Sequence, residues 1–348
     1  MMYSLNEVGL IPAESSNIKH RSLVNPYDKN GFLPIFVSPM TCISGLEDID
    51  TYLNSKVIQI IPRPESIIKD DNGNIHLLDG NMWKAVSLQD FIELFLVRKD
   101  EMINQIKDYP IKILIDIANG HMDSLFDSAK EAKKIYGDNL ILMVGNIANY
   151  YVYEKCILSD IDYVRVSIGT GSACTTSMLT GIHASHVYLL EGINEIRDMY
   201  KYPYSNLYKS KLPKVIIDGG INTIDKAIKA LALGADYVMM GKMFAQCNDI
   251  HLSTLSNNNS IRDYYGMASN KGQLDLNGSI TKSSEGAELK ISTKYSIKDF
   301  LNKFEAALRS CMSYCNADCL DNFIGKVKYE IMSQEEFNSY YDDKKLII

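Results

Sequence analysis

The chain has 348 residues, of which 46% are hydrophobic and 23% charged, and its formal net charge is −7. This length suits one large α/β barrel or two ordinary domains. The acidic balance without a Lys/Arg cluster argues against nucleic-acid binding, and no apolar run is long enough to span a bilayer. Residues 1–7 lack the features of a secretory signal. The seven cysteines show no disulfide framework, so we expect a cytoplasmic protein in a reducing environment.

Apolar, β-branched runs alternate with helical patterns along the chain, which is typical of parallel strands connected by helices. After an extended lead-in at residues 1–30, eight strands are predicted, at Leu33–Ser38, Lys56–Ile61, Trp83–Leu88, Lys112–Ile117, Asn139–Val144, Tyr163–Ile168, Lys214–Asp218 and Tyr237–Met240. Eight strand–helix units indicate an α/β fold, a single-domain (β/α)8 TIM barrel over residues 31–348. In that fold the chemistry sits on the loops after the C-terminal ends of the strands.

Two segments depart from this alternation. Asp70–Asn74 has turn composition and predicts a small hairpin before the third strand. From Cys247 to Glu288 the chain lacks helix or strand periodicity over much of its length, which is too long for a routine connection. We therefore expect an active-site flap at about 247–290, followed by a helix near Ser296–Cys315 and a C-terminal tail.

The segment Gly169–Thr176, with the sequence GTGSACTT, follows the sixth predicted strand and is called the cysteine loop below. Its glycines let the backbone approach a ligand closely, and Cys174 is the candidate nucleophile, because a loop rich in backbone N–H groups favours thiolate. The alternative is that Cys174 is a small packing residue, as most free cysteines are. The surrounding glycines, serine and threonines favour the nucleophile.

The residues Asp218, Gly219 and Gly220 close one strand and precede a helix near Thr223, and Gly241 ends the next strand. Paired strand-end glycines of this kind hold a phosphate on backbone N–H groups, and Asp218 is well placed for ribose hydroxyls. The alternative is a pair of tight turns. Many flavin-binding and phosphosugar barrels share this pattern, so by itself it does not identify the substrate.

Other reactive side chains carry weaker signals. Glu285 lies in the flap and, without a template, is a solvated loop carboxylate. Cys311, Cys315 and Cys319 repeat every four residues, but no histidine is close in sequence, so we expect packing cysteines and no structural zinc. His121, His183 and His186 lie at strand ends or in loops, where one of them would contact a ligand.

With these residues in view, the chain resembles the IMP dehydrogenase/GMP reductase family over nearly its whole length. The matching segments are Leu10–Pro12, Ser38–Met40, Asp116–His121, Gly145–Ile147, the cysteine loop, Asp218–Gly220 and Tyr265–Ser269. The resemblance implies a (β/α)8 barrel, usually a homotetramer, that acts on purine 5′-monophosphates with a nicotinamide cofactor. It implies that Cys174 attacks C2 of the purine and that Asp218 holds the ribose.

The resemblance also implies roles for residues around the cysteine loop. The substrate and its phosphate would be bound by Ser172, Gly219, Gly220, Gly241, Lys242, Tyr264, Gly266 and Met267. Asp116, Asn119 and Arg63 would lie on the cofactor side. Backbone carbonyls of Gly169, Gly171 and Cys174 would bind a monovalent cation such as K⁺.

Within the family the flap favours a reductase. Only about twenty residues separate the second and third strands, which leaves no room for the CBS domain pair common in IMP dehydrogenases. Dehydrogenases also need an Arg-Tyr pair in the flap to activate water, and the span from Asn270 to Glu285 contains neither residue type. Ser284-Glu285-Gly286 resembles the reductase motif, whose glutamate works with the threonine at Thr176. We therefore expect NADPH-dependent conversion of GMP, or of a related nucleotide such as dGMP, to IMP and ammonia.

Several positions depart from the family pattern. Thr41 replaces an aspartate, Ser167 and Thr170 replace Gly and Pro, Lys242 replaces a small residue, and His183-Ala184-Ser185 replaces Gly-x-Pro-Gln. Gln246 to Asn259 also lacks a segment that is usual in the family. The changes at Thr41, Ser185 and Lys242 leave open a purine-nucleotide-binding regulator without turnover, and an IMP dehydrogenase is the alternative among enzymes. A flavin-dependent barrel would not need Cys174.

Overall fold

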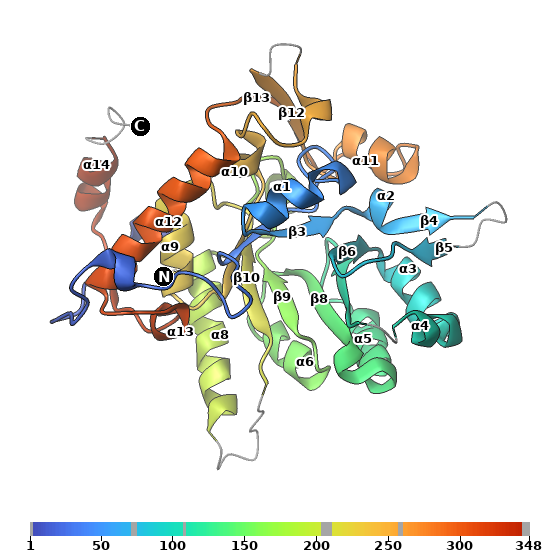
Figure 1. The fold of residues 1–348 in the computed structure, drawn as a ribbon, viewed down its shortest axis with the longest axis horizontal. Helices are drawn as coiled ribbons and strands as arrows, with labels where there is room; N and C mark the ends of the chain where they lie inside the picture. Colours follow the sequence, from blue (N-terminus) through green and yellow to red (C-terminus); the bar gives the residue numbers. More distant parts are fainter. Residues whose placement is uncertain (1–2, 71–74, 107–108, 203–210, 257–259, 343–348) are drawn as a thin grey trace.

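Eight parallel strands form the closed barrel at the centre of the molecule (Figure 1). The computed structural model describes residues 3–70, 75–106, 109–202, 211–256 and 260–342. The barrel strands are β2 (Ile35–Val37), β3 (Ile58–Ile61), β6 (Trp83–Val86), β7 (Ile111–Asp116), β8 (Leu140–Ile147), β9 (Tyr163–Val166), β10 (Lys214–Asp218) and β11 (Tyr237–Met240). They follow one another around the barrel in chain order, and β11 pairs with β2 to close it. The predicted (β/α)8 barrel and its eight strands are confirmed.

Helices connect the strands and cover the outside of the barrel. Their bounds are α1 Ile49–Asn54, α2 Arg63–Ser66, α3 Leu88–Ile92, α4 Lys99–Gln105, α5 Asp123–Tyr136, α6 Val152–Leu158, α7 Thr176–Thr180, α8 His186–Lys201, α9 Ile224–Ala232, α10 Lys242–Ala245, α11 Asn270–Asn277, α12 Ile297–Tyr314, α13 Leu320–Phe323 and α14 Gln334–Asp342. Short 3₁₀ turns are η1 Leu5–Glu7, η2 Arg21–Leu23, η3 Leu46–Asp48, η5 Gly137–Asn139 and η6 Leu252–Thr254, and η4 (Glu93–Val97) is π-helical. None of the described helices has the length and apolar character needed to cross a membrane.

Helix α12 shows how sequence pattern becomes packing. The Ser296 side chain accepts a hydrogen bond from the Asp299 N–H and caps its first turn. Phe300, Phe304 and Leu308 recur at four-residue spacing and are buried, so one face of the helix packs against the core. The helix expected near 296–315 is therefore confirmed.

The barrel interior is filled with apolar side chains at one end. The aromatic rings of Phe36, Trp83 and Tyr237 meet there, with the Phe36 centroid 5.9 Å from that of Trp83 and 5.2 Å from that of Tyr237. They pack with Leu114 and Ile216 in a cluster inside the strands. Because this layer leaves no room for a ligand, polar chemistry is confined to the carboxyl ends of the strands.

The N-terminal lead-in is more structured than its composition indicates. Besides η1 and η2 it contains β1 (Val8–Leu10), which pairs antiparallel with β14 (Tyr329–Ile331) near the other end of the chain. Val8 is fully buried. Such pairing is invisible to local pattern because the two strands are more than 300 residues apart in sequence.

The segment between β11 and α12 also contains regular structure. Strands β12 (Ile261–Tyr265) and β13 (Glu288–Ser292) form an antiparallel pair with α11 between them in the chain, at the top of Figure 1. The expectation that this segment lacks periodicity over much of its length is wrong in this respect. Strand β12 was not predicted because Arg262, a charged residue that is fully buried, breaks the apolar pattern expected of a buried strand.

The guanidinium of Arg262 is satisfied by the backbone. It donates hydrogen bonds to the carbonyl oxygens of Ala245, Cys247, Ile250 and His251 at 2.5–3.1 Å. These hydrogen bonds fix the chain that follows β11 against β12. The smaller hairpin expected around Asp70–Asn74 is confirmed by β4 (Ile67–Lys69) and β5 (Ile75–Leu77), which pair antiparallel; residues 71–74 lie outside the described ranges.

Candidate active site

The cysteine loop follows β9 and is held against the flap by backbone contacts. The Thr175 N–H donates to the Glu285 carbonyl at 3.0 Å, and the Ala287 N–H donates to the Ala173 carbonyl at 2.9 Å. Cys174 and Gly286 face each other in an antiparallel bridge. Two segments more than 100 residues apart thus form one ribbon, and Cys174 sits at its centre.

A line of three side chains crosses this ribbon. The Cys174 Sγ lies 3.3 Å from the Thr176 Oγ1, which lies 3.0 Å from the Glu285 Oε2. The hydroxyl is therefore placed to accept from a thiol and to donate to a carboxylate. Thiol, hydroxyl and carboxyl groups in hydrogen-bond reach of one another form a route for a proton between the flap and the sulfur. We call Cys174, Thr176 and Glu285 the relay.

Below the relay, a buried arginine joins two strand-end carboxylates. Arg165 on β9 donates from Nη1 to the Asp116 Oδ1 at 2.7 Å and from Nη2 to the Asp218 Oδ2 at 2.7 Å. Arg63 reaches the other oxygen of Asp116 at 3.1 Å. Asn146 Nδ2 also donates to the Asp218 Oδ2, at 2.8 Å. The two aspartates assigned to cofactor and ribose therefore belong to one network.

The pairing keeps Asp116 and Arg165 charged despite burial. Burial by itself would raise the pKa of Asp116, but Arg63 and Arg165 outweigh it and hold that pKa below its ordinary value. Burial would likewise lower the pKa of Arg165, but the carboxylates of Asp218 and Asp116 raise it above the ordinary value. Arg165 was not among the predicted site residues. The available signal was a charged residue inside an apolar strand, which is rare unless the charge is paired.

The assigned phosphate residues gather where β10, β11 and the flap meet. Gly219 and Gly220 have φ values of +82° and +72°, which favour glycine at both positions. Tyr264 of β12 is buried, and a Cβ on Gly241 would lie 2.9 Å from its Oη. Burial raises the pKa of Tyr264, so its hydroxyl is a neutral donor at this point.

The remaining predicted substrate-binding residues lie in the cysteine loop, at the start of α10 and in the flap. Ser172 is exposed in the cysteine loop, and Lys242 begins α10 directly after Gly241. Gly266 packs so closely under the loop that a Cβ would lie 2.5 Å from the Ala173 carbonyl oxygen. Met267 lies half-buried beside Thr41, whose Oγ1 is 3.7 Å from its Sδ.

Thr41 has a defined role in the structure. Its hydroxyl donates to the Asp275 Oδ2 of α11 at 2.6 Å, and the Tyr265 hydroxyl donates to the same oxygen at 2.7 Å. Thr41 stands where the family pattern has an aspartate, and Asp275 of the flap accepts the hydrogen bond from its hydroxyl. This departure holds the flap against the start of the barrel.

Other candidates lie apart from the relay. Asn119 is exposed and its Oδ1 accepts from the His121 N–H, while the His121 Nε2 accepts from the Ala148 N–H at 2.9 Å. His183 and His186 line a separate pocket. Cys311 of α12 and Cys315, the residue that follows the helix, are half-buried and pack against the main core.

Comparison with known proteins identifies the relatives of this site. Residues 96–339 match the model of the IMP dehydrogenase/GMP reductase domain. The chain belongs to the IMP dehydrogenase/GMP reductase family. This is a family of oxidoreductases of purine metabolism, and the resemblance seen in the cysteine loop is confirmed.

The relatives include both IMP dehydrogenases and GMP reductases, at similar sequence identity to this chain. The chain is 28% identical over 255 residues to inosine-5′-monophosphate dehydrogenase of Nitrosopumilus maritimus, covering 70% of this chain and 50% of that protein. It is 30% identical over 236 residues to GMP reductase of Buchnera aphidicola subsp. Schizaphis graminum, covering 66% of this chain and 64% of that protein. GMP reductase of Shewanella pealeana is 27% identical, with 72% and 68% covered. The chain thus spans between half and about two thirds of these relatives, and the choice between the two names rests on the site.

Proposed function

We propose that this protein is a GMP reductase, which uses NADPH to convert GMP, or a closely related guanine nucleotide such as dGMP, to IMP and ammonia. The observation that carries the proposal is the relay, with 3.3 Å from Cys174 Sγ to Thr176 Oγ1 and 3.0 Å from there to Glu285 Oε2. The composition of the flap supports the same proposal, because the span from Asn270 to Glu285 contains no Arg or Tyr that would activate water.

The chemistry needs a sulfur nucleophile and a proton source on one side of the purine. The Cys174 thiolate adds to C2, and the exocyclic amine leaves as ammonia once it is protonated through Thr176 from the Glu285 carboxyl group. The C2–N bond breaks and a covalent thioimidate remains on Cys174. C2 then receives a hydride, which is the chemistry that a reduced nicotinamide supplies, and the C2–S bond breaks to release IMP and the thiolate.

Binding groups surround the proposed reaction centre. Asp218, held in place by Arg165 and Asn146, would accept from ribose hydroxyls. The substrate phosphate would lie among the N–H groups of Ser172, Gly220 and Gly241, with the Tyr264 hydroxyl as a further donor. In this pose the purine would lie above the barrel network with its C2 toward the cysteine loop.

The residues on the far side of Cys174 fit a nicotinamide cofactor. Arg63 pairs with Asp116 and still has 30% of its side chain exposed, and Asn119 is exposed. Arg63 and Asn119 would hold the polar groups of NADPH, while Asp116 orients Arg63. A cation such as K⁺ would share the loop carbonyls of Gly169 and Gly171, which now accept from Ser177 Oγ at 2.9 Å and the Cys174 N–H at 3.0 Å.

The decisive experiment follows NADPH absorbance with GMP and measures ammonia in parallel, with IMP plus NAD⁺ as the reverse reaction. We expect equal amounts of NADPH lost and ammonia released. Cys174→Ala should abolish turnover and retain nucleotide binding. Glu285→Gln should slow ammonia release, whereas Glu288→Gln, an exposed flap carboxylate outside the relay, should have little effect.

The other outcomes would each replace the proposal. Turnover only with IMP and NAD⁺ would make the protein an IMP dehydrogenase. Nucleotide binding without turnover in either direction would indicate a purine-nucleotide-binding regulator. Ammonia release that is unchanged in Glu285→Gln would remove Glu285 from the proton route. We expect a homotetramer, which sedimentation of the purified protein tests.

A further inference from the structure

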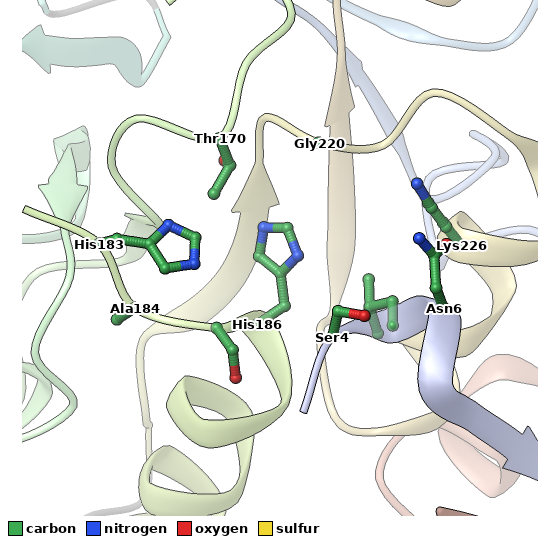
Figure 2. A pocket seen from close by; sticks show the side chains of 10 residues that line it. Ser4, Asn6, Thr170, His183, Ala184, His186, Gly220 and Lys226 are labelled. Carbon is green, nitrogen blue, oxygen red and sulfur yellow. The ribbon is translucent and has the colours of Figure 1, made fainter. Parts of the chain in front are cut away.

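A pocket lies between the first turns of α8 and α9 and the N-terminal turn η1 (Figure 2). It has a volume of about 160 Å³, and its polar lining comes from Ser4, Asn6, Thr170, His183, Ser185, His186 and Lys226. We call it the histidine pocket. None of the relay residues lines it, and it touches the substrate site only through Thr170 and Gly220. It forms where His183-Ala184-Ser185 departs from the family pattern.

His186 carries a buried atom without a partner. Its side chain comes from the first residue of α8 and is only 8% exposed, and its Nε2 has no hydrogen-bond partner within the described residues. Burial lowers the pKa of His186, so the ring is neutral and carries one proton. With that proton on Nδ1, Nε2 is an acceptor. A buried acceptor of this kind is costly unless a ligand or water donates to it.

The facing wall of the pocket is positively charged. Lys226 is the third residue of α9, and its Nζ binds the neutral Asn222 Oδ1 at 2.9 Å. The neighbouring carboxylate, Asp225, pairs instead with Lys229 at 3.4 Å. No side chain caps the N-terminus of α9. Figure 2 places the His186 ring between His183 on one side and Lys226 and Asn6 on the other.

We propose that the histidine pocket binds a phosphoryl group, either free phosphate or the phosphate of a nucleotide, in addition to the substrate. The negative oxygens would face Lys226 and the uncapped start of α9, where the helix dipole favours an anion. A protonated phosphate oxygen would donate to the His186 Nε2. Phosphate carries such a proton near neutral pH and sulfate does not, so the pocket should prefer phosphate.

The test is calorimetric titration of Cys174→Ala protein with inorganic phosphate, in the absence and presence of saturating GMP. We expect one phosphate per chain under both conditions, and weaker binding of sulfate. Lys226→Met should weaken phosphate binding by about tenfold or more, as expected for loss of a charged hydrogen bond. His186→Phe should remove the preference for phosphate over sulfate, and His186→Gln, which keeps an acceptor, should retain part of it.

Lys298→Met is the matched control. Lys298 is exposed in the first turn of α12, whose N-terminus is already capped by Ser296, so its loss should leave phosphate binding unchanged. Melting temperatures of all variants check that the fold is intact. A second equivalent of GMP that binds in a Lys226-dependent manner would identify the nucleotide phosphate as the ligand, and phosphate binding alone would identify the free ion.

Two results would overturn the proposal. Phosphate affinity that is equal in Lys226→Met and in the parent would mean an adventitious ion only. Phosphate that is displaced by GMP and lost in Tyr264→Phe would belong to the substrate site. If the protein binds no GMP at all, the proposed function fails, but Lys226-dependent phosphate binding would still support the histidine pocket.

Discussion

Replacement of Arg165 by methionine tests the network at the floor of the site. The substitution keeps an unbranched side chain close to the aliphatic stem of arginine but removes the cation that joins Asp116 and Asp218. Breaking a buried ion pair by removing one partner costs about 3–5 kcal/mol. Asp116 keeps Arg63 and Asp218 keeps Asn146, so we expect a loss near the lower limit, about 3 kcal/mol of unfolding free energy.

Urea unfolding at pH 7, followed by circular dichroism, measures this loss. In Arg165→Met the Asp218 carboxylate loses its cation and keeps only the Asn146 amide as a side-chain partner. The double variant Arg165→Met with Asp218→Asn no longer carries that carboxylate, so it should recover part of the loss.

Two results would contradict this role of Arg165. A loss of less than about 1 kcal/mol would mean that the ion pairs add little beyond their desolvation cost. A loss that Asp218→Asn does not relieve would attribute the effect to packing. Arg165→Lys is the second variant, because it retains the charge but cannot bridge both carboxylates with the same planar fork.

Three further predictions concern the loop, the histidine pocket and the phosphate site. Gly266→Ala should lower the urea midpoint and cost about 1–3 kcal/mol, because its Cβ would lie 2.5 Å from the Ala173 carbonyl oxygen. Gly9→Ala, which meets only contacts of 3.6 Å or more, should be neutral in the same assay. Burial lowers the pKa of His186 from 6.5 to about 4, so its contribution to stability is complete above pH 6.5 and declines as the pH falls toward 4. At pH 5 the decline is about 2 kcal/mol, and His186→Gln should show a flatter profile between pH 7 and pH 5; identical profiles would contradict this. Tyr264→Phe should raise the KM for GMP roughly tenfold in NADPH-oxidation assays by removing a hydrogen bond to the phosphate, and an unchanged KM would exclude that contact.

Much of the fold could be predicted from short-range sequence patterns. The strand Tyr237–Met240 and the helix that follows Ser296 are each specified by residues within a few positions of one another. Apolar β-branched runs bounded by glycine predict buried parallel strands, and apolar residues at helical spacing behind a capping serine predict a helix. The cysteine loop likewise contains its proposed nucleophile, Cys174, in a run of small and polar residues, so this candidate was accessible from sequence pattern, whereas the role of Thr176 came from the family resemblance.

Glu285 was accessible only through resemblance to a family. Nothing in its own neighbourhood distinguishes it from a solvated loop carboxylate, and its position 3.0 Å from Thr176 depends on the bridge between the flap and the cysteine loop. Contacts of this kind join residues far apart in sequence, and periodicity carries no information about them.

The sequence by itself determined the eight strands, their order as strand–helix units and the presence of a thiol loop at a strand end, because these depend on neighbouring residues. Only the tertiary structure decided that Arg165 joins Asp116 to Asp218, that β1 pairs with β14 and that His186 faces Lys226 across a pocket. Closure of the barrel brings the ends of β7, β9 and β10 together, and that proximity lets a buried charge find partners more than 45 residues away.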